Sequence, residues 1–151
     1  MFNAQEVLEK LQPLSVENIE DIGDILQYLI PWAALLVVAL QGDKEGAWNW
    51  LYAGTATTLL TYIGKFVFNF TSLGKRPDGG IYSFPSGHTS SAFMGAAFFH
   101  FQVGIVWAII PYALAILTGY SRVWSGKHWV HDVVAGALLA IIITYGVVIV
   151  I

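Results

Sequence analysis

The chain has 151 residues, of which 56% are hydrophobic and only 11% are charged. Soluble domains carry about 25% charged residues, so this composition excludes an ordinary water-soluble fold and indicates a membrane protein. The formal net charge of −3, with no basic block, argues against nucleic acid as a partner. The absence of cysteine excludes disulfides and thiolate metal sites.

The N-terminal segment, residues 1–24, is acidic and amphipathic. Its apolar residues recur at roughly helical spacing, but its six carboxylates and one lysine prevent it from spanning a bilayer. We expect an amphipathic N-terminal helix that lies on the membrane surface or caps the bundle, separate from a transmembrane domain over residues 25–151. A partly ordered tail is the alternative.

The rest of the chain predicts an all-α integral membrane bundle of about five transmembrane helices. The apolar stretches that form them cover residues 25–41, 46–70, 89–101, 105–120 and 129–151. About 17–25 apolar residues are needed to cross a bilayer, so the stretch at 89–101 is short for a span. Aromatic residues near the start of the second stretch, Trp48, Trp50 and Tyr52, are placed as an interfacial aromatic belt would be.

Counting the crossings places two polar loops on one side of the membrane. The loops at 71–88 and 121–128 are separated by two crossings, so they lie on the same face, together with the N-terminal segment. The turns near 42–46 and 102–104 lie on the opposite face. Most side chains that can do chemistry are therefore expected at one mouth of the bundle.

The residue types at this mouth suit a phosphate group. Arg76 lies in the first loop and Arg122 in the second, and a guanidinium group binds phosphate oxygens two at a time. Gly87 precedes a predicted helix start, where free backbone N–H groups and the helix dipole favour an anion. The sequence therefore predicts a site for a tetrahedral oxyanion at the membrane surface.

Two histidines and an aspartate suggest how such a phosphate would react. His128 and Asp132 are four residues apart at the start of a predicted helix, so they share a face. A carboxylate bonded to one imidazole nitrogen leaves the other nitrogen free to attack phosphorus. His88, from the other loop, is placed to protonate the leaving oxygen. The scheme needs no metal or other cofactor, and the sequence has no carboxylate cluster to hold Mg²⁺.

These motifs resemble the type 2 phosphatidic acid phosphatase family, whose superfamily includes the vanadium haloperoxidases. The family's second motif, Pro-Ser-Gly-His, stands at residues 85–88. Its third motif, Ser-Arg, five residues, His, three residues and Asp, stands at residues 121–132. The resemblance covers about residues 65–132, and two full motifs in the right order make it specific.

The family's first motif, Lys followed by six residues and Arg-Pro, matches only at its end, Arg76-Pro77. Its lysine is displaced, because Asn69 occupies the expected position. We favour Lys65, one helical turn further upstream, as the family lysine, and Lys75 is the alternative.

The resemblance implies a role for each matching residue. His128 would be the nucleophile, Asp132 its orienting partner and His88 the acid. The residues implied in phosphate binding are Arg76, Arg122, Ser86, the Gly87 backbone N–H and Lys65. His131 does not fit the motif spacing, and we interpret it as a supporting residue beside Asp132.

The function implied is a membrane lipid phosphatase that hydrolyses a terminal phosphate of a lipid phosphate or pyrophosphate through a phosphohistidine. The family suggests phosphatidylglycerol phosphate, undecaprenyl pyrophosphate, phosphatidic acid or lipid A as substrates, in a bacterial inner membrane with the site facing the periplasm or exterior. A lipid phosphotransferase using the same histidine and a non-catalytic protein that binds anionic lipid are the alternatives. Family members usually have six crossings, one more than this chain offers.

Overall fold

The structure is a computed structural model that describes residues 16–151. Its elements in chain order are α2 (Val16–Leu40), α3 (Lys44–Phe68), the short η1 (Ser72–Gly74), α4 (Gly87–Phe98) continued by the π-helical η2 (Phe99–Val103), α5 (Ile105–Trp124), and α6 (Val130–Tyr145) continued by the π-helical η3 (Gly146–Val150). The predicted all-α bundle is confirmed, with one helix for each apolar stretch. Helix α2 continues through Asp24 without a break, so the last part of the expected N-terminal segment belongs to the first bundle helix. The remainder of that segment lies outside the described residues.

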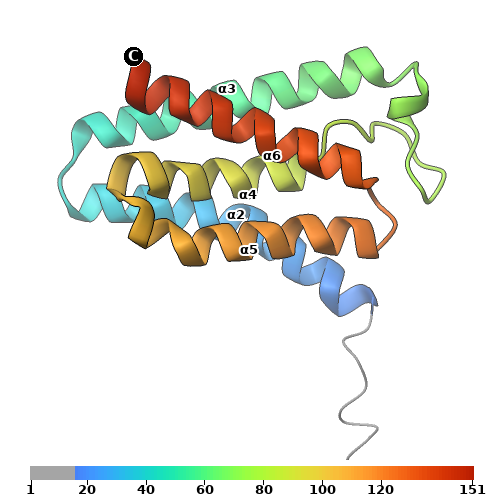
Figure 1. Ribbon diagram of the computed structural model, residues 1–151, viewed down its shortest axis with the longest axis horizontal. Helices are drawn as coiled ribbons and strands as arrows, with labels where there is room; N and C mark the ends of the chain where they lie inside the picture. Colours follow the sequence, from blue (N-terminus) through green and yellow to red (C-terminus); the bar gives the residue numbers. More distant parts are fainter. Residues whose placement is uncertain (1–15) are drawn as a thin grey trace, which may run out of the picture.

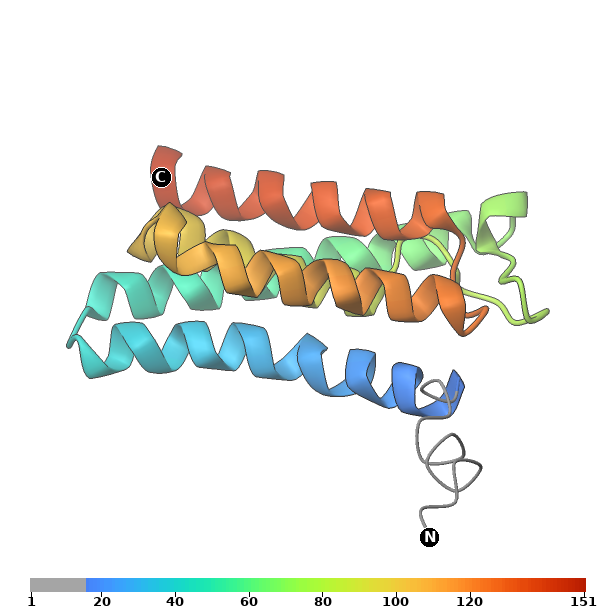
Figure 2. The same ribbon diagram turned by 60° about the horizontal axis from the view of Figure 1, so that its bottom comes forward.

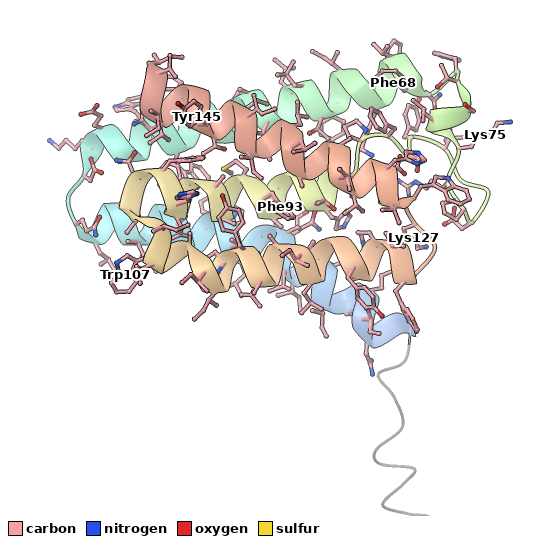
Figure 3. The ribbon with its side chains drawn as sticks, viewed as in Figure 1. Phe68, Lys75, Phe93, Trp107, Lys127 and Tyr145 are labelled. Carbon is pink, nitrogen blue, oxygen red and sulfur yellow. The ribbon has the colours of Figure 1, made fainter. Side chains whose placement is uncertain are left out.

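Helix α4 occupies the centre of the bundle and packs against α2, α3, α5 and α6 (Figures 1 and 2). The long loop between α3 and α4, the loop between α5 and α6, and the start of α2 lie at one end. The turns that follow α2 and η2, and the C-terminus, lie at the other end. Figure 3 shows Lys75 and Lys127 at the first end and Trp107 at the second. The two polar loops therefore share one mouth, as counting the crossings predicted.

The packing is typical of a membrane bundle, with small residues inside and large apolar residues outside. The alanines in the interior are fully buried, at positions 34, 53, 92, 96, 97, 108, 115 and 140. Trp32, Ile110 and Ile142 point outward and are each more than half exposed. Small residues let helices approach closely in lipid, where apolar surface faces the hydrocarbon. Within the described part, three segments are long and apolar enough to cross a membrane: Asn18–Leu40, Ile105–Trp124 and Val130–Val150.

Pro31 in the middle of α2 joins three helices. Proline has no N–H, so the carbonyl of Gln27 one turn earlier lacks its usual partner; the Ser91 hydroxyl of α4 donates to it at 2.6 Å. The indole N–H of Trp50 on α3 donates to the Pro31 carbonyl at 2.8 Å. Gly95 of α4 lies directly against Pro31, where a Cβ atom would come within 2.5 Å of the proline nitrogen. The close contact between α2 and α4 therefore requires glycine at position 95.

Gly95→Ala is expected to lower the free energy of unfolding by about 1–3 kcal/mol, the usual cost of overpacking a close contact. The added methyl group would meet backbone atoms of Pro31, which cannot rotate away. The matched control is Gly146→Ala, because a Cβ atom there meets nothing within 4 Å. Thermal unfolding of the detergent-solubilised variants measures the difference in stability between them. Equal unfolding midpoints for Gly95→Ala and Gly146→Ala would show that the contact between α2 and α4 does not require glycine at position 95.

Candidate active site

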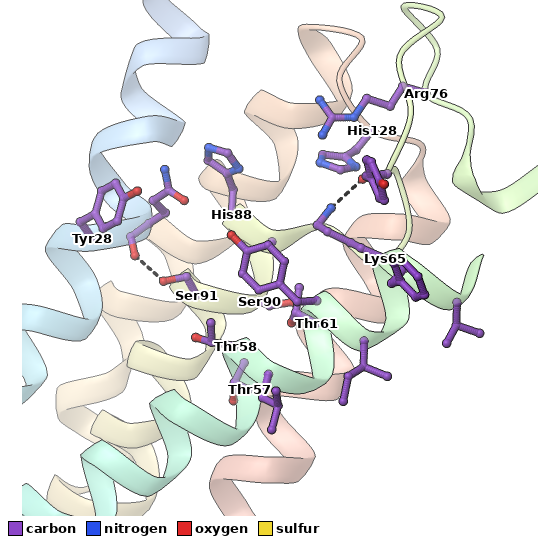
Figure 4. A pocket seen from close by; sticks show the side chains of 18 of the residues that line it. Tyr28, Thr57, Thr58, Thr61, Lys65, Arg76, His88, Ser90, Ser91 and His128 are labelled. Atoms are coloured by element: carbon purple, nitrogen blue, oxygen red, sulfur yellow. Dashed lines mark hydrogen bonds between the residues drawn. The ribbon is translucent and has the colours of Figure 1, made fainter. Parts of the chain in front are cut away.

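An open cavity of about 1170 Å³ lies at the end of the bundle that carries the two polar loops. Its walls come from α2, α3, α4 and both loops. Lys65, Arg76, His88 and His128 all line it (Figure 4). The structure therefore brings both predicted histidines to one space, together with two of the predicted cations.

His128 is held by the turn that follows α5. The backbone N–H groups of Lys127 and His128 donate to the carbonyl oxygen of Arg122 at 3.0 and 3.1 Å, so the chain folds back at once. This brings Nδ1 of His128 to 3.3 Å from Oδ2 of Asp132. With Nδ1 donating its proton to the carboxylate, Nε2 is the nitrogen left for a substrate.

Asp132 is fully buried and accepts several hydrogen bonds. Besides His128, the Ser83 hydroxyl and the Trp129 backbone N–H donate to Oδ2, the latter at 3.0 Å. The Ser83 hydroxyl comes from the opposite loop, and no motif or spacing in the sequence distinguishes it from the other hydroxyls there. His131, half-exposed, lies with Nε2 3.2 Å from Oδ1 of Asp132, and its supporting role stays a prediction.

The surroundings of His128 favour its neutral form. Burial lowers the pKa of this imidazole well below its ordinary value of 6.5, and the positive charges of Lys65 and Arg76 lower it further, against the opposing charge of Asp132. A neutral imidazole carries a free lone pair at neutral pH. His128 therefore has the protonation state that a nucleophile needs.

Two cations face His128 from the first loop and from α3. Lys65 donates from Nζ to the carbonyl oxygens of Tyr82 and Ser83 at 2.7 and 3.3 Å, which holds its ammonium group at the cavity wall. Arg76 lines the same wall, and its buried Nε–H finds no hydrogen-bond partner within residues 16–151. Of the two candidate lysines, the structure places Lys65 in the cavity, whereas Lys75 is exposed on the outside of the loop (Figure 3).

The start of α4 forms another part of the wall. Gly87 lines the cavity, and a Cβ atom at this position would point to within 3.6 Å of Cε of Lys65. The missing side chain leaves space between Lys65 and the first N–H groups of the helix, where an anion is favoured. Ser86 is buried and does not line the cavity. Its N–H donates to the Asp132 carbonyl at 3.0 Å and its hydroxyl accepts from Thr89, so Ser86 joins α4 to α6, and its expected phosphate contact stays a prediction.

Arg122 is only 3% exposed and lies behind the cavity wall, in contact with α2. Its Nη1 is 2.6 Å from Oδ1 of Asp24, and its Nη2 is 3.6 Å from Oε1 of Glu20. Nε2 of His88 lies 2.9 Å from the same Asp24 oxygen. The sequence placed the acidic segment at this mouth but gave no sign that its carboxylates would enter the site.

Comparison with known proteins gives the family. Residues 46–151 match the PAP2 superfamily. The chain belongs to this superfamily. The predicted membership in the type 2 phosphatidic acid phosphatase family is thereby confirmed.

The relatives of this PAP2 chain include bacterial lipid phosphatases. It is 30% identical over 149 residues to a lipid A 1-phosphatase of Porphyromonas gingivalis, covering 94% of the chain and 34% of that protein. It is 34% identical over 131 residues to a lipid A 4'-phosphatase of Helicobacter pylori, covering 81% of the chain and 65% of that protein. It is 31% identical over 134 residues to the undecaprenyl-diphosphatase BcrC of Bacillus subtilis, covering 80% of the chain and 68% of that protein. The chain thus spans about a third of the first of these relatives and just under two thirds of the second.

The PAP2 chain also shares its fold with a solved structure, the crystal structure of LpxE from Aquifex aeolicus. The TM-score is 0.74 at 25% sequence identity, and the match covers 90% of this chain and 86% of the other. The helical arrangement of this chain is therefore found in a solved structure as well.

Proposed function

We propose that the protein is a membrane lipid phosphatase that removes a terminal phosphate from a lipid phosphate or pyrophosphate. The observation that carries this proposal is that one cavity is lined by His88, from the start of α4, by His128, from the loop between α5 and α6, and by Lys65 and Arg76. The named activities of the relatives, on lipid A and on undecaprenyl diphosphate, support it.

The reaction proceeds in two steps at phosphorus. Nε2 of His128 attacks, the bond between phosphorus and the lipid oxygen breaks, and His88 gives that oxygen a proton, which leaves a neutral lipid alcohol and a phosphohistidine (or a lipid monophosphate when the substrate is a pyrophosphate). A water molecule then attacks the phosphohistidine and returns a proton to His88, so inorganic phosphate leaves and both histidines regain their starting states. The ammonium of Lys65 and the guanidinium of Arg76 stabilise the charge on the non-bridging oxygens.

A second cavity offers a place for the lipid chain. It measures about 530 Å³ and lies between α2, α3 and α4. It shares five lining residues with the first cavity: Tyr28, Thr58, Leu59, Tyr62 and Ser91. An apolar chain would lie in this opening while its phosphate reaches the mouth. Phosphatidylglycerol phosphate, undecaprenyl pyrophosphate, phosphatidic acid and lipid A all have this form. By resemblance to the family, the mouth faces the periplasm or exterior of a bacterial inner membrane.

The test is phosphate release from a short-chain lipid phosphate by the purified protein in detergent with excess chelator. Release that persists under chelation and stops with orthovanadate supports the scheme. Release that requires added Mg²⁺ would contradict it. Adding a lipid alcohol distinguishes transfer of the phosphate to the alcohol from transfer to water.

The pH dependence follows from the surroundings of His128. Because burial and the nearby cations lower its pKa, the ring loses its proton at a lower pH than an ordinary histidine and stays neutral as the medium becomes acidic. The acid limb of kcat/KM, which reports the free enzyme's base, is therefore expected below pH 6.5. Initial rates measured between pH 4 and 9 would place this limb, and a limb at or above 6.5 would show that the charges at the site act differently.

A further inference from the structure

The carboxylate of Asp24 contacts both His88 and Arg122. Its Oδ1 lies 2.6 Å from Nη1 of Arg122 and 2.9 Å from Nε2 of His88. The side chain also lines the cavity, whereas Arg122 does not. A single oxygen atom therefore joins the predicted acid to a buried arginine.

This contact depends on close packing between α2 and α5. Gly23 lies against Ser121, and a Cβ atom at Gly23 would overlap the Ser121 hydroxyl. The glycine lets the helices approach until the side chain that follows it, Asp24, reaches Arg122. Glu20, one turn earlier on α2, pairs with the same guanidinium and with Lys127 at 3.6 and 3.7 Å. The position of Asp24 is therefore fixed by packing and by charge together.

The charges around His88 explain why a carboxylate is needed there. Burial lowers the pKa of this imidazole, and the positive charges of Arg122 from α5 and Lys65 from α3 lower it further, against the opposing charge of Asp24. Arg76 and His128 line the same cavity from the two loops. Positive neighbours disfavour a proton on the ring. Asp24 is the negative group in direct contact with it. A histidine that must give a proton to a leaving group therefore depends on this carboxylate.

We propose that Asp24 is a positioning residue of the phosphatase, which orients His88 and favours its protonated state for transfer of the proton to the lipid oxygen. This proposal rests on the proposed function. Asp24 accepts from Nε2–H of His88, so Nδ1 is the nitrogen that gives the proton. The pair corresponds, on the acid side of the cavity, to His128 and Asp132 on the nucleophile side. Arg122 holds the Asp24 carboxylate in place.

The experiment compares Asp24→Asn with Asp24→Glu and with the unaltered protein, using the short-chain lipid phosphate in detergent. The asparagine variant keeps the shape but loses the charge. We expect its kcat to fall by about tenfold or more, a part of the effect that a general acid usually has. We expect its alkaline limb of kcat to move to lower pH, because the uncharged side chain holds the His88 proton less well, while the acid limb set by His128 stays in place. The glutamate variant should recover part of the rate and return the limb toward its original position.

Glu20→Gln is the matched control, since it removes a carboxylate from the same helix and the same arginine without touching His88. It should leave the alkaline limb where it is. Thermal unfolding midpoints of all variants show whether they are folded, and a folded Asp24→Asn variant with the original pH profile would overturn the proposal. So would a rise in activity with a lower KM, because Asp24 would then compete with the substrate phosphate. If the unaltered protein itself releases no phosphate, the proposed function fails and takes this proposal with it.

Discussion

Replacing His128 with alanine is expected to reduce phosphate release by about 10⁴-fold or more, as loss of a covalent nucleophile does in other hydrolases. The physical reason is that His128 supplies the atom that bonds to phosphorus, and His88 or water cannot take its place at the same point in the cavity. The unaltered protein should also form a labelled phosphoenzyme when it is mixed briefly with a lipid phosphate carrying ³²P and quenched in alkali. The label should be labile to acid, as a phosphohistidine is, and His128→Ala should not form it.

The control for this experiment is His100→Ala. His100 lies on η2 at the opposite end of the bundle, where its Nδ1 is 3.3 Å from the Tyr112 hydroxyl, so its loss should leave the rate unchanged. An alanine variant of His128 that is folded and retains more than a few per cent of the rate would show that another group attacks phosphorus.

The meeting of the two loops could be predicted from the sequence because it depends only on how many helices separate them. The proximity of His128 and Asp132 could be predicted from their spacing too, although α6 begins only at Val130 and the turn after α5, not a shared helix face, brings the two together. Both inferences use local geometry and chain topology. They hold whatever the detailed packing of the bundle is.

The contacts of Asp24 could not be predicted, because they depend on that packing. Asp24 and Arg122 are 98 residues apart, and they meet only because Gly23 lets α2 approach α5. The same limit applies to Ser83, whose hydroxyl reaches Asp132 from another loop. The buried position of Ser86 could not be predicted for a related reason, since its N–H is used in holding α4 against the start of α6.

The charges around the cavity suggest that some of the basic residues bind the substrate phosphate and that others pair with carboxylates of the protein. Arg122 and Lys127 form ion pairs with carboxylates of α2, so their charge is largely balanced before a substrate arrives. Lys65 and Arg76 line the cavity, and Lys65 is held there by neutral carbonyl groups. We therefore expect Lys65 and Arg76 to carry most of the phosphate charge, and Arg122 to act mainly through Asp24.

Asp132→Asn is expected to lower kcat by about 10³- to 10⁴-fold, the loss seen when an orienting carboxylate beside a catalytic histidine becomes an amide. The buried carboxylate accepts hydrogen bonds at Oδ2 from His128, Ser83 and Trp129. An amide oxygen in that place would keep these acceptor contacts but lose the negative charge that stabilises a cationic His128 as it bonds to phosphorus. An amide NH₂ group in that place would instead put a donor against the N–H groups of His128 and Trp129. It would favour the tautomer of His128 with the proton on Nε2, which cannot attack phosphorus.

Ser83→Ala distinguishes the effect of the charge of Asp132 on activity from the effect of its position. This variant removes one donor to Asp132 and leaves the carboxylate in place, so its kcat should fall far less than that of Asp132→Asn. Nitrogen-15 chemical shifts of the His128 ring would report the tautomer directly, with the proton on Nδ1 in the unaltered protein and in Ser83→Ala. If Asp132→Asn kept both the rate and this tautomer, the carboxylate would serve only to hold the start of α6, and the nucleophile would be oriented by its own burial and by the turn after α5.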